Sequence, residues 1–162
     1  KQYRHILKYL NSDHKILSEY IERNIQGIIS SDLDYHIPYV NSKKYLRMIP
    51  NPIDIDTLNK DIKSVNQKIV ILHAINSKTK LKKGNKFFEK SLSIIEAKYS
   101  NKVEIIRTID QAYSDHIKNV KNCEILLDRV YAYDQGYNAL EAMAMGKVVL
   151  TGAEKELSLI HI

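Results

Sequence analysis

The residues whose types and spacing are best suited to chemistry lie in the segment 134–147. Gly136 falls where a strand is expected to turn into a helix, and a glycine there lets the backbone approach a ligand closely. The helix start that follows offers unpaired N–H groups and the positive end of the helix dipole, which together favour anions. Glu141 comes about one helical turn later, on the side of Tyr137 and Asn138. Its carboxylate is suited to accept hydrogen bonds from a pair of sugar hydroxyls, although an isolated glutamate on a helix is more often simply solvated.

A short basic segment is the second candidate site. Four lysines fall between Lys78 and Lys83, next to Gly84 and soon after an apolar run at residues 68–73. The whole chain has 25 basic and 19 acidic residues, a formal net charge of +6, which is compatible with a polyanionic partner. No aromatic-plus-basic RNA-binding motif accompanies this charge, so we expect a local phosphate site and no nucleic-acid partner.

Cysteine usage and hydropathy limit the class of protein. Cys123 is the only cysteine, so no internal disulfide can form, and no Cys/His spacing is typical of a zinc site. The apolar run after Cys123 favours a buried structural thiol over a nucleophile. No apolar stretch approaches the roughly 20 residues that cross a bilayer, and the first residues do not form the apolar run of a signal peptide. We therefore expect a soluble protein in the reducing cytoplasm.

Alternating strands and helices must position the candidate residues. Helical spacing of apolar residues predicts helices up to residue 21, followed by short strands at 25–29 and 45–49. From residue 68 onward, nearly continuous apolar runs are typical of buried parallel strands. Their alternation with helices predicts right-handed βαβ units in an α/β, Rossmann-like three-layer fold with a parallel sheet. The strands are expected at 68–73, 103–106, 124–128 and 147–151, and the helices at 87–95, 112–120 and 137–145.

The stretch from Gly136 to Val149 resembles a passage of GT-B glycosyltransferases, especially families 1 and 4. That passage has a Gly-Phe-Gly turn, then Glu-Ala-Met-Ala and, after a further glycine, Pro-Val. The resemblance implies that Gly136, Tyr137 and Asn138 face the diphosphate of a nucleotide sugar and that Glu141 binds the nucleotide ribose. It also implies that the Rossmann-like domain is half of a GT-B fold.

Two earlier passages agree with this resemblance. Residues 72–84 are similar to the family's strand, Gly-Arg, short spacer and Lys-Gly, with Lys78 at the position of the arginine and Lys83 in the Lys-Gly pair. Both cations would neutralise the diphosphate leaving group of a glycosyl transfer, although lysine is a weaker bidentate clamp than arginine. Residues 47–54 look like the family's Ile-Pro-Asn-Gly-Val-Asp interdomain linker, with Pro52 in place of glycine.

The chain departs from the family pattern eight residues before Glu141. The family has a second glutamate there, which contacts the donor sugar, whereas this sequence has Tyr133 followed by Asp134. Either Asp134 takes over that contact through a shifted loop, or the sugar is bound differently. Tyr133 and Asp134 are therefore the candidate sugar contacts, and no catalytic or metal-binding residue is assigned. Asp128, at the end of a strand, is expected only to cap or orient the following loop.

The resemblance divides the chain at the proline-containing linker. Residues 1–54 are expected to be the tail of an acceptor-side N-terminal domain with its linker, and residues 55–162 a nucleotide-sugar-binding domain truncated at its C-terminus. The expected function is transfer of a sugar from a donor such as a UDP- or GDP-sugar to a cell-surface polysaccharide or glycolipid, without a further cofactor. The enzyme would act in the cytoplasm or at the inner face of the membrane, which the missing domain would contact. The chain alone is expected to be inactive.

Two alternatives remain open on the sequence. The missing first glutamate is compatible with a relative that binds a nucleotide sugar without catalysis. An unrelated Rossmann-like module for another phosphorylated ligand is the second alternative. A dinucleotide dehydrogenase is disfavoured, because no Gly-x-Gly-x-x-Gly follows the strand at 68–73.

Overall fold

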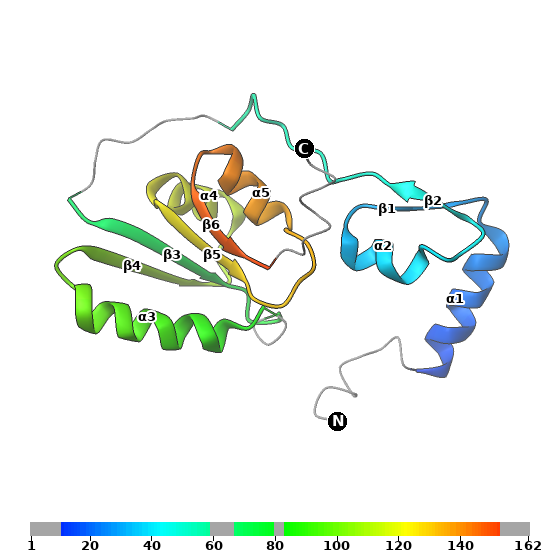
Figure 1. Ribbon diagram of the computed structural model, residues 1–162, viewed down its shortest axis with the longest axis horizontal. Helices are drawn as coiled ribbons and strands as arrows, with labels where there is room; N and C mark the ends of the chain where they lie inside the picture. Colours follow the sequence, from blue (N-terminus) through cyan, green and yellow to red (C-terminus); the bar gives the residue numbers. More distant parts are fainter. Residues whose placement is uncertain (1–10, 59–66, 80–82, 153–162) are drawn as a thin grey trace.

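The computed structural model describes residues 11–58, 67–79 and 83–152 of the chain. These residues form a two-stranded sheet near the N-terminus and a four-stranded sheet further along. The elements around the smaller sheet lie to one side of the larger one (Figure 1). Between the two sheets, residues 49–54 have no regular structure and include Pro50 and Pro52. The stretch that resembles a linker is therefore irregular, as two prolines so close together favour.

The N-terminal elements are α1 (Ser12–Asn24), β1 (Ile28–Ser30), α2 (Leu33–Tyr39) and β2 (Tyr45–Met48), and the two strands pair in parallel. The strand predicted from residue 25 begins only at Ile28. The reason is that the N–H of Ile25 still caps α1 by donating to the carbonyl of Ile21 at 3.0 Å. The part of the N-terminal helix predicted at residues 6–10 lies outside the described residues.

The larger sheet is built from β3 (Ile69–Ile75), β4 (Val103–Ile109), β5 (Ile125–Arg129) and β6 (Val148–Thr151). Its strands pair in parallel in the order β4-β3-β5-β6. Helices α3 (Asn85–Tyr99), α4 (Tyr113–Asn122) and α5 (Tyr137–Ala144) lie between successive strands. The predicted alternation is confirmed. The strand expected at 103–106 continues to residue 109, because β4 keeps its pairing with β3 to the end of both strands.

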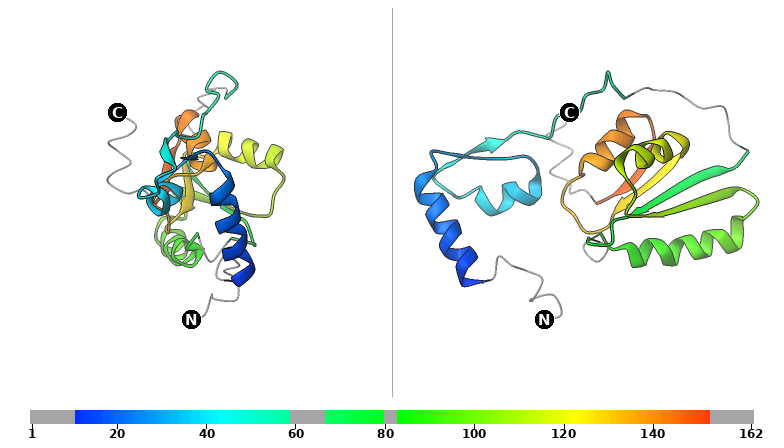
Figure 2. Two further views of the ribbon diagram at one scale, coloured as in Figure 1. Left: turned by 90° about the vertical axis from the view of Figure 1, so that its right-hand side faces the viewer. Right: turned by 180° about the vertical axis from the view of Figure 1, so that it is seen from behind.

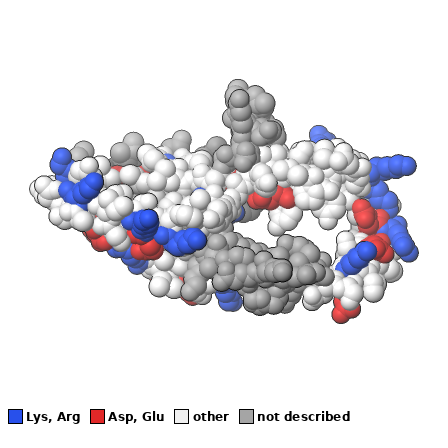
Figure 3. Space-filling view, turned by 60° about the horizontal axis from the view of Figure 1, so that its bottom comes forward, with Lys and Arg blue, Asp and Glu red and all other residues white. Residues whose placement is uncertain are grey.

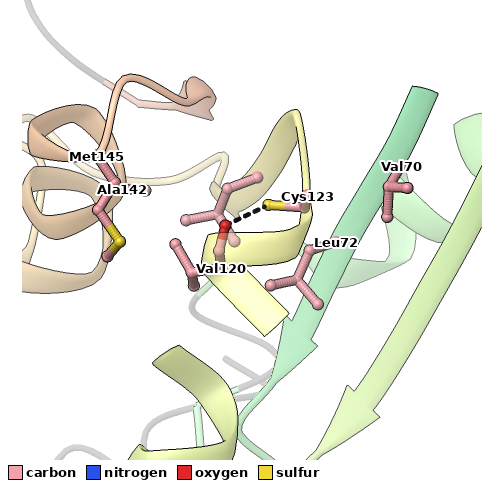
Figure 4. Packing of buried hydrophobic residues seen from close by; sticks show 7 residues of the cluster. Val70, Leu72, Val120, Cys123, Ala142 and Met145 are labelled. Atoms are coloured by element: carbon pink, nitrogen blue, oxygen red, sulfur yellow. Dashed lines mark hydrogen bonds between the residues drawn. The ribbon is translucent and has the colours of Figure 1, made fainter. Parts of the chain in front are cut away.

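Helices cover both faces of the larger sheet, so that the sheet is the middle one of three layers (Figure 2). On one face, Leu92 of α3 packs with Ile71 and Leu127 of the sheet. On the other face, Val120 and Ala142 bring α4 and α5 into a second apolar cluster. The predicted α/β, Rossmann-like arrangement is confirmed. Other buried members of the second cluster are Val70, Leu72, Cys123, Leu126 and Met145 (Figure 4).

The single cysteine belongs to this core. Cys123 has no exposed surface, and its Sγ donates a weak hydrogen bond to the carbonyl of Val120 at 3.3 Å (Figure 4). Burial raises the pKa of the thiol to about 11. The thiol is therefore protonated at neutral pH, and the expectation of a structural cysteine is confirmed.

The surface carries charges of both signs. Figure 3 shows Lys and Arg side chains interspersed with Asp and Glu at both ends of one face, and they do not form one continuous basic strip there. Within the described part of the chain, every helix is too short or too polar to cross a membrane.

The strand order creates a switch point between β3 and β5. From β3 the chain moves to β4 on one side, and after α4 it returns to β5 on the other side. In open parallel sheets, ligands bind outside the carboxyl ends of the strands at such a point. Lys83 lies between β3 and α3 and Gly136 between β5 and α5, so the fold brings both residues to the same edge of the sheet.

Candidate functional site

The carboxylate of Asp128 lies near the carboxyl end of β5, at the switch point, and has no exposed surface. Its Oδ1 accepts hydrogen bonds from Nζ of Lys83 at 3.2 Å and from Nδ2 of Asn138 at 3.1 Å. Its Oδ2 accepts from Nε of Arg129 at 3.1 Å and from Oγ1 of Thr151 at 3.2 Å. These five residues, here called the Asp128 cluster, join the segment before α3, the helix α5 and the ends of β5 and β6.

The cluster keeps its central carboxylate ionised. Burial is the strongest single influence and favours the neutral acid, but Lys83, Asn138 and Arg129 together outweigh it, so the pKa of Asp128 lies below its usual value. The side chains of Lys83 and Arg129 remain 19% and 27% exposed. Two cations and one carboxylate leave the cluster with a net positive charge that solvent, or an anionic ligand, can reach.

A left-handed glycine lets Lys83 reach this cluster. Gly84 is the N-cap of α3 and has a φ of +70°, a conformation that residues with a side chain rarely adopt. A Cβ on Gly84 would lie only 2.9 Å from the Cβ of Val130. Because the two segments pack so closely, the N–H of Val130 donates to the carbonyl of Lys83 at 2.9 Å. The backbone of Lys83 is thus fixed against the loop that follows β5.

The helix α5 begins at the glycine turn that the sequence singled out. Gly136 is its N-cap and provides no side-chain acceptor for the first N–H groups of the helix. The guanidinium of Arg129 lies against Gly136, in the space that a Cβ would take. Arg129 therefore places a positive charge beside the positive end of the helix dipole, and both favour an anion there. The predicted helix end is also found, with Gly146 in the left-handed region at a φ of +74°.

Two residues of α4 hold the polar side chains of α5. Oη of Tyr113 donates a hydrogen bond to Oε1 of Glu141 at 2.6 Å, and this bond is the main reason that the pKa of Tyr113 is raised. Nε2 of His116 lies 2.5 Å from Oδ1 of Asn138. Because Nδ2 of Asn138 already donates to the carboxylate of Asp128, Oδ1 is an acceptor and Nε2 of His116 is the donor. The two α5 side chains are thus oriented from the neighbouring helix.

The structure separates the two lysines that the sequence proposed as a pair. Lys83 contacts Asp128, whereas Lys78 is exposed and, among the described residues, makes no hydrogen bond or ion pair with the Asp128 cluster. The charge of Lys78 lies near Asp110 instead. Hydrogen bonds from Ser77 are the main cause of the lowered pKa of Asp110, and Lys78 adds to them.

The two candidate sugar contacts, Tyr133 and Asp134, differ sharply in their exposure to solvent. Tyr133 is 48% exposed, as is Tyr137 of the glycine turn at 50%, whereas Asp134 is only 6% exposed. Oδ2 of Asp134 accepts from the backbone N–H of Leu33 at 3.2 Å, and Oδ1 accepts from the N–H of Gln135 at 2.6 Å. Both oxygens of Asp134 are therefore engaged, and one of them links the loop before α5 to the start of α2.

The sequence reasoning missed five contributors to this site, namely Asp128, Arg129, Thr151, Tyr113 and His116. For Asp128 there was a usable signal, because a charged residue at the end of an otherwise apolar strand must find partners once buried. Arg129 follows directly and shares that signal. Tyr113 and His116 had none, because only the packing of α4 against α5 shows what they contact.

No protein-family model matches this chain, and comparison with curated proteins finds no relative. The fold and the contacts of the Asp128 cluster are therefore the basis for assigning a function.

Proposed function

We propose that this chain is the donor-binding part of a nucleotide-sugar-dependent glycosyltransferase of the GT-B type. The observation that carries the proposal is the convergence of Lys83 and Asn138 on Asp128 at the switch point of a parallel sheet. Lys83 and Asn138 come from the two separate segments that resemble donor-binding passages of that family. Neighbouring strands bring the two loops to one edge of the sheet, but convergence on a single oxygen atom is a closer relationship than a shared edge requires.

The diphosphate of the donor is assigned to the space beside Lys83, Arg129 and the start of α5. Arg129 supplies the guanidinium that the sequence lacks at Lys78, and a planar guanidinium suits bidentate phosphate binding better than an ammonium. Asp128 accepts only the Nε hydrogen of Arg129, and Nη1 and Nη2 make no hydrogen bond to any other residue that the structure describes, so both are assigned to the ligand. In this arrangement Lys78 is peripheral, and its exposed ammonium attracts the anion from a distance.

The ribose of the nucleotide is assigned to Glu141. Tyr113 occupies Oε1 of that carboxylate, and no hydrogen bond from a described residue reaches Oε2. Oε2 is available to a ribose hydroxyl, and a second hydroxyl gains Oε1 when it displaces Tyr113. The tyrosine is 63% exposed, so it can move aside without disturbing a packed core.

The positive charges also suit the chemistry of transfer. When the bond between the sugar's anomeric carbon and the diphosphate oxygen breaks, negative charge grows on the departing nucleoside diphosphate. Fixed cations and helix N–H groups directed at that charge stabilise the transition state more than the ground state. The acceptor, a polysaccharide or glycolipid in this proposal, belongs to a second domain, and the reaction belongs to the cytoplasm or the inner face of the membrane.

A protein that binds a nucleotide sugar without transferring it is the second candidate. Tyr133 stands where the family has its first glutamate, and both oxygens of Asp134 already accept backbone hydrogen bonds. Neither side chain offers a free carboxylate to the donor sugar in this arrangement. A sugar-transfer assay on the full-length protein separates the two candidates, because turnover supports the transferase and binding without turnover supports the second candidate.

Titration calorimetry of the 162-residue chain with UDP and with GDP tests the binding site. Lys83→Ala and Glu141→Ala each remove a charged partner of the ligand. Loss of such a hydrogen bond costs about 1.5–3 kcal/mol, so we expect the affinity to fall roughly tenfold or more. The matched controls are Lys118→Ala and Glu104→Ala, which remove exposed charges on α4 and β4, away from the Asp128 cluster.

The two outcomes differ clearly. Weaker binding in the two site variants, with unchanged binding in the two controls, supports the assignment. Parent-like affinity in both site variants shows that the nucleotide binds elsewhere, and absence of binding to the parent chain contradicts the proposed function.

A further inference from the structure

Asp128 differs from the other members of its cluster because it is fully buried and only accepts hydrogen bonds. Its side chain has no exposed surface, so a ligand cannot reach its oxygens without displacing a protein group. Lys83, Asn138, Arg129 and Thr151 each donate one hydrogen bond to it. An ionised carboxylate has about four lone-pair positions, so these donors use its whole capacity. Asp128 is therefore placed to act on a ligand only through its neighbours.

Lys83 and Arg129 have further hydrogen-bond donors that Asp128 does not use. A lysine ammonium has three N–H donors and an arginine guanidinium has five. Asp128 takes one donor from Lys83 and one from Arg129. Both cations are partly exposed, so their remaining donors are within reach of a ligand.

We propose that Asp128 is the positioning residue of the donor site, which holds Lys83, Arg129 and Asn138 in the geometry that a nucleoside diphosphate requires. The inference rests on the proposed function for the identity of the ligand. The claim that Asp128 holds its neighbours in place does not depend on any ligand, because the four contacts are made by the chain itself.

Removal of the carboxylate has two opposite effects on anion binding. Deleting one negative charge makes the cluster more positive, which alone strengthens the binding of any anion. Deleting the shared acceptor also frees two long side chains to sample other rotamers and leaves buried donors without a partner. A positioning role requires that the loss of positioning outweighs the gain in positive charge. Weaker binding of the nucleotide therefore supports the positioning role, and tighter binding contradicts it.

Asp128→Asn is the sharpest variant because it keeps the shape of the side chain. The amide has one oxygen to accept hydrogen bonds, and its NH₂ group is a donor. Two of the four donors that converge on this position would then face another donor. We expect UDP or GDP to bind roughly tenfold more weakly or worse, measured by calorimetry on the full chain. The control Asp115→Asn makes the same change at an exposed carboxylate of α4 and leaves the affinity unchanged.

A spectroscopic signature tests the positioning without any ligand. The side-chain amide of Asn138 donates to Asp128 and accepts from His116, so its NMR signal reports on the cluster. The signal is identified by its loss in Asn138→Ala. In Asp128→Asn we expect it to shift and its hydrogens to exchange faster with solvent, and in Asp115→Asn we expect no change.

Thr151→Val keeps the proposal testable if Asp128→Asn does not fold. This substitution conserves side-chain shape and charge and removes the hydroxyl that donates to Oδ2 of Asp128 at 3.2 Å, together with its longer contact of 3.5 Å to the carbonyl of Gly152. We expect a shifted Asn138 amide signal and a few-fold weaker UDP affinity.

Three results have distinct meanings. A folded Asp128→Asn chain that binds the nucleotide as tightly as the parent, or more tightly, overturns the positioning role. An unchanged Asn138 signal in both Asp128→Asn and Thr151→Val overturns it as well. If the parent chain binds neither UDP nor GDP, the proposed function fails, while the amide signal still decides whether Asp128 positions its neighbours.

Discussion

The hydroxyl of Tyr113 donates a hydrogen bond to Oε1 of Glu141 at 2.6 Å and so connects the start of α4 to the middle of α5. The same carboxylate is the proposed ligand of the nucleotide ribose. A tyrosine hydroxyl and a ribose hydroxyl are chemically alike as donors, so the free chain already contains a hydrogen bond of the kind that the ligand would make. Under the proposed function, Tyr113 and the ribose compete for one oxygen atom.

Tyr113→Phe is expected to tighten nucleotide binding. The phenylalanine keeps the ring but frees Oε1 of Glu141, so the ligand no longer has to break an existing hydrogen bond. An exposed hydrogen bond of this kind is worth about 0.5–1.5 kcal/mol, which corresponds to a gain of between about twofold and tenfold in affinity. Calorimetry with UDP measures the gain, and Tyr99→Phe at an exposed position of α3 is the control. Weaker binding in Tyr113→Phe would show that the hydroxyl assists the ligand.

The ionisation of Tyr113 gives an independent measure of the same contact. Its pKa is raised, first by the hydrogen bond to Glu141, then by burial and by the carboxylate charge. The neutral phenol is thus favoured in the fold, and this stabilisation is present below the unfolded pKa of about 10 and is lost as pH rises through the folded pKa. We expect Glu141→Gln to lower the pKa of Tyr113. The titration is followed by tyrosine absorbance, with Tyr113→Phe to identify the signal. An unchanged pKa in Glu141→Gln would mean that the contact is absent in solution.

The larger sheet could be predicted because its strands are marked by runs of apolar residues that are adjacent in the sequence. The run at β3 is almost wholly apolar and β5 opens with three apolar residues, as is typical of strands covered on both faces. Helix α2 could not be predicted in the same way, since it contains Pro38 and has only seven residues. Its first turn is held by Asp32, which accepts from the N–H of Tyr35 at 3.1 Å, and by Asp134, which is distant in sequence.

The candidate site was predictable only in part, for a similar reason. A glycine turn before a helix and a cation before a glycine have local signatures, and these pointed to Gly136 and Lys83. The pairing of Lys83 with Asp128 joins residues 45 positions apart, and nothing in their spacing indicates it. The interpretation of Lys78 as the partner cation followed a family pattern, whereas the structure places Arg129 beside the glycine turn.

The left-handed conformation of Gly84 predicts a large loss of stability on substitution. Gly84→Ala forces a side chain into a φ of +70°, which costs about 1–2 kcal/mol, and brings its Cβ to 2.9 Å from the Cβ of Val130. Overpacking of this kind adds about 1–3 kcal/mol. Gly146 is the matched control, because its φ is +74° but a Cβ would meet nothing within 4 Å. Urea unfolding should therefore show a larger loss for Gly84→Ala than for Gly146→Ala. Equal losses would mean that Val130 does not pack against Gly84.

Asp134 is expected to stabilise the contact between α2 and the loop before α5. Its Oδ2 accepts from the N–H of Leu33, a residue that is itself 4% exposed, so Asp134→Ala leaves a buried donor without its partner. Such a loss costs about 1–3 kcal/mol. We expect the Leu33 amide to exchange faster with solvent and the midpoint of urea unfolding to fall. Asp54→Ala is the control, because Asp54 accepts from Asp56 and Thr57 in an exposed turn where water can replace it.

The same variant separates the two roles considered for Asp134. If the carboxylate holds α2, Asp134→Ala changes the exchange of the Leu33 amide and leaves the affinity for UDP, which lacks the donor sugar, within about twofold of the parent. If Asp134 instead contacts the donor sugar, the amide exchanges as before and the affinity for a UDP- or GDP-sugar falls while that for the free nucleotide is unchanged. Because both of its oxygens already accept backbone hydrogen bonds, we expect the first pattern. The second pattern would show that α2 moves away from Asp134 when the donor binds.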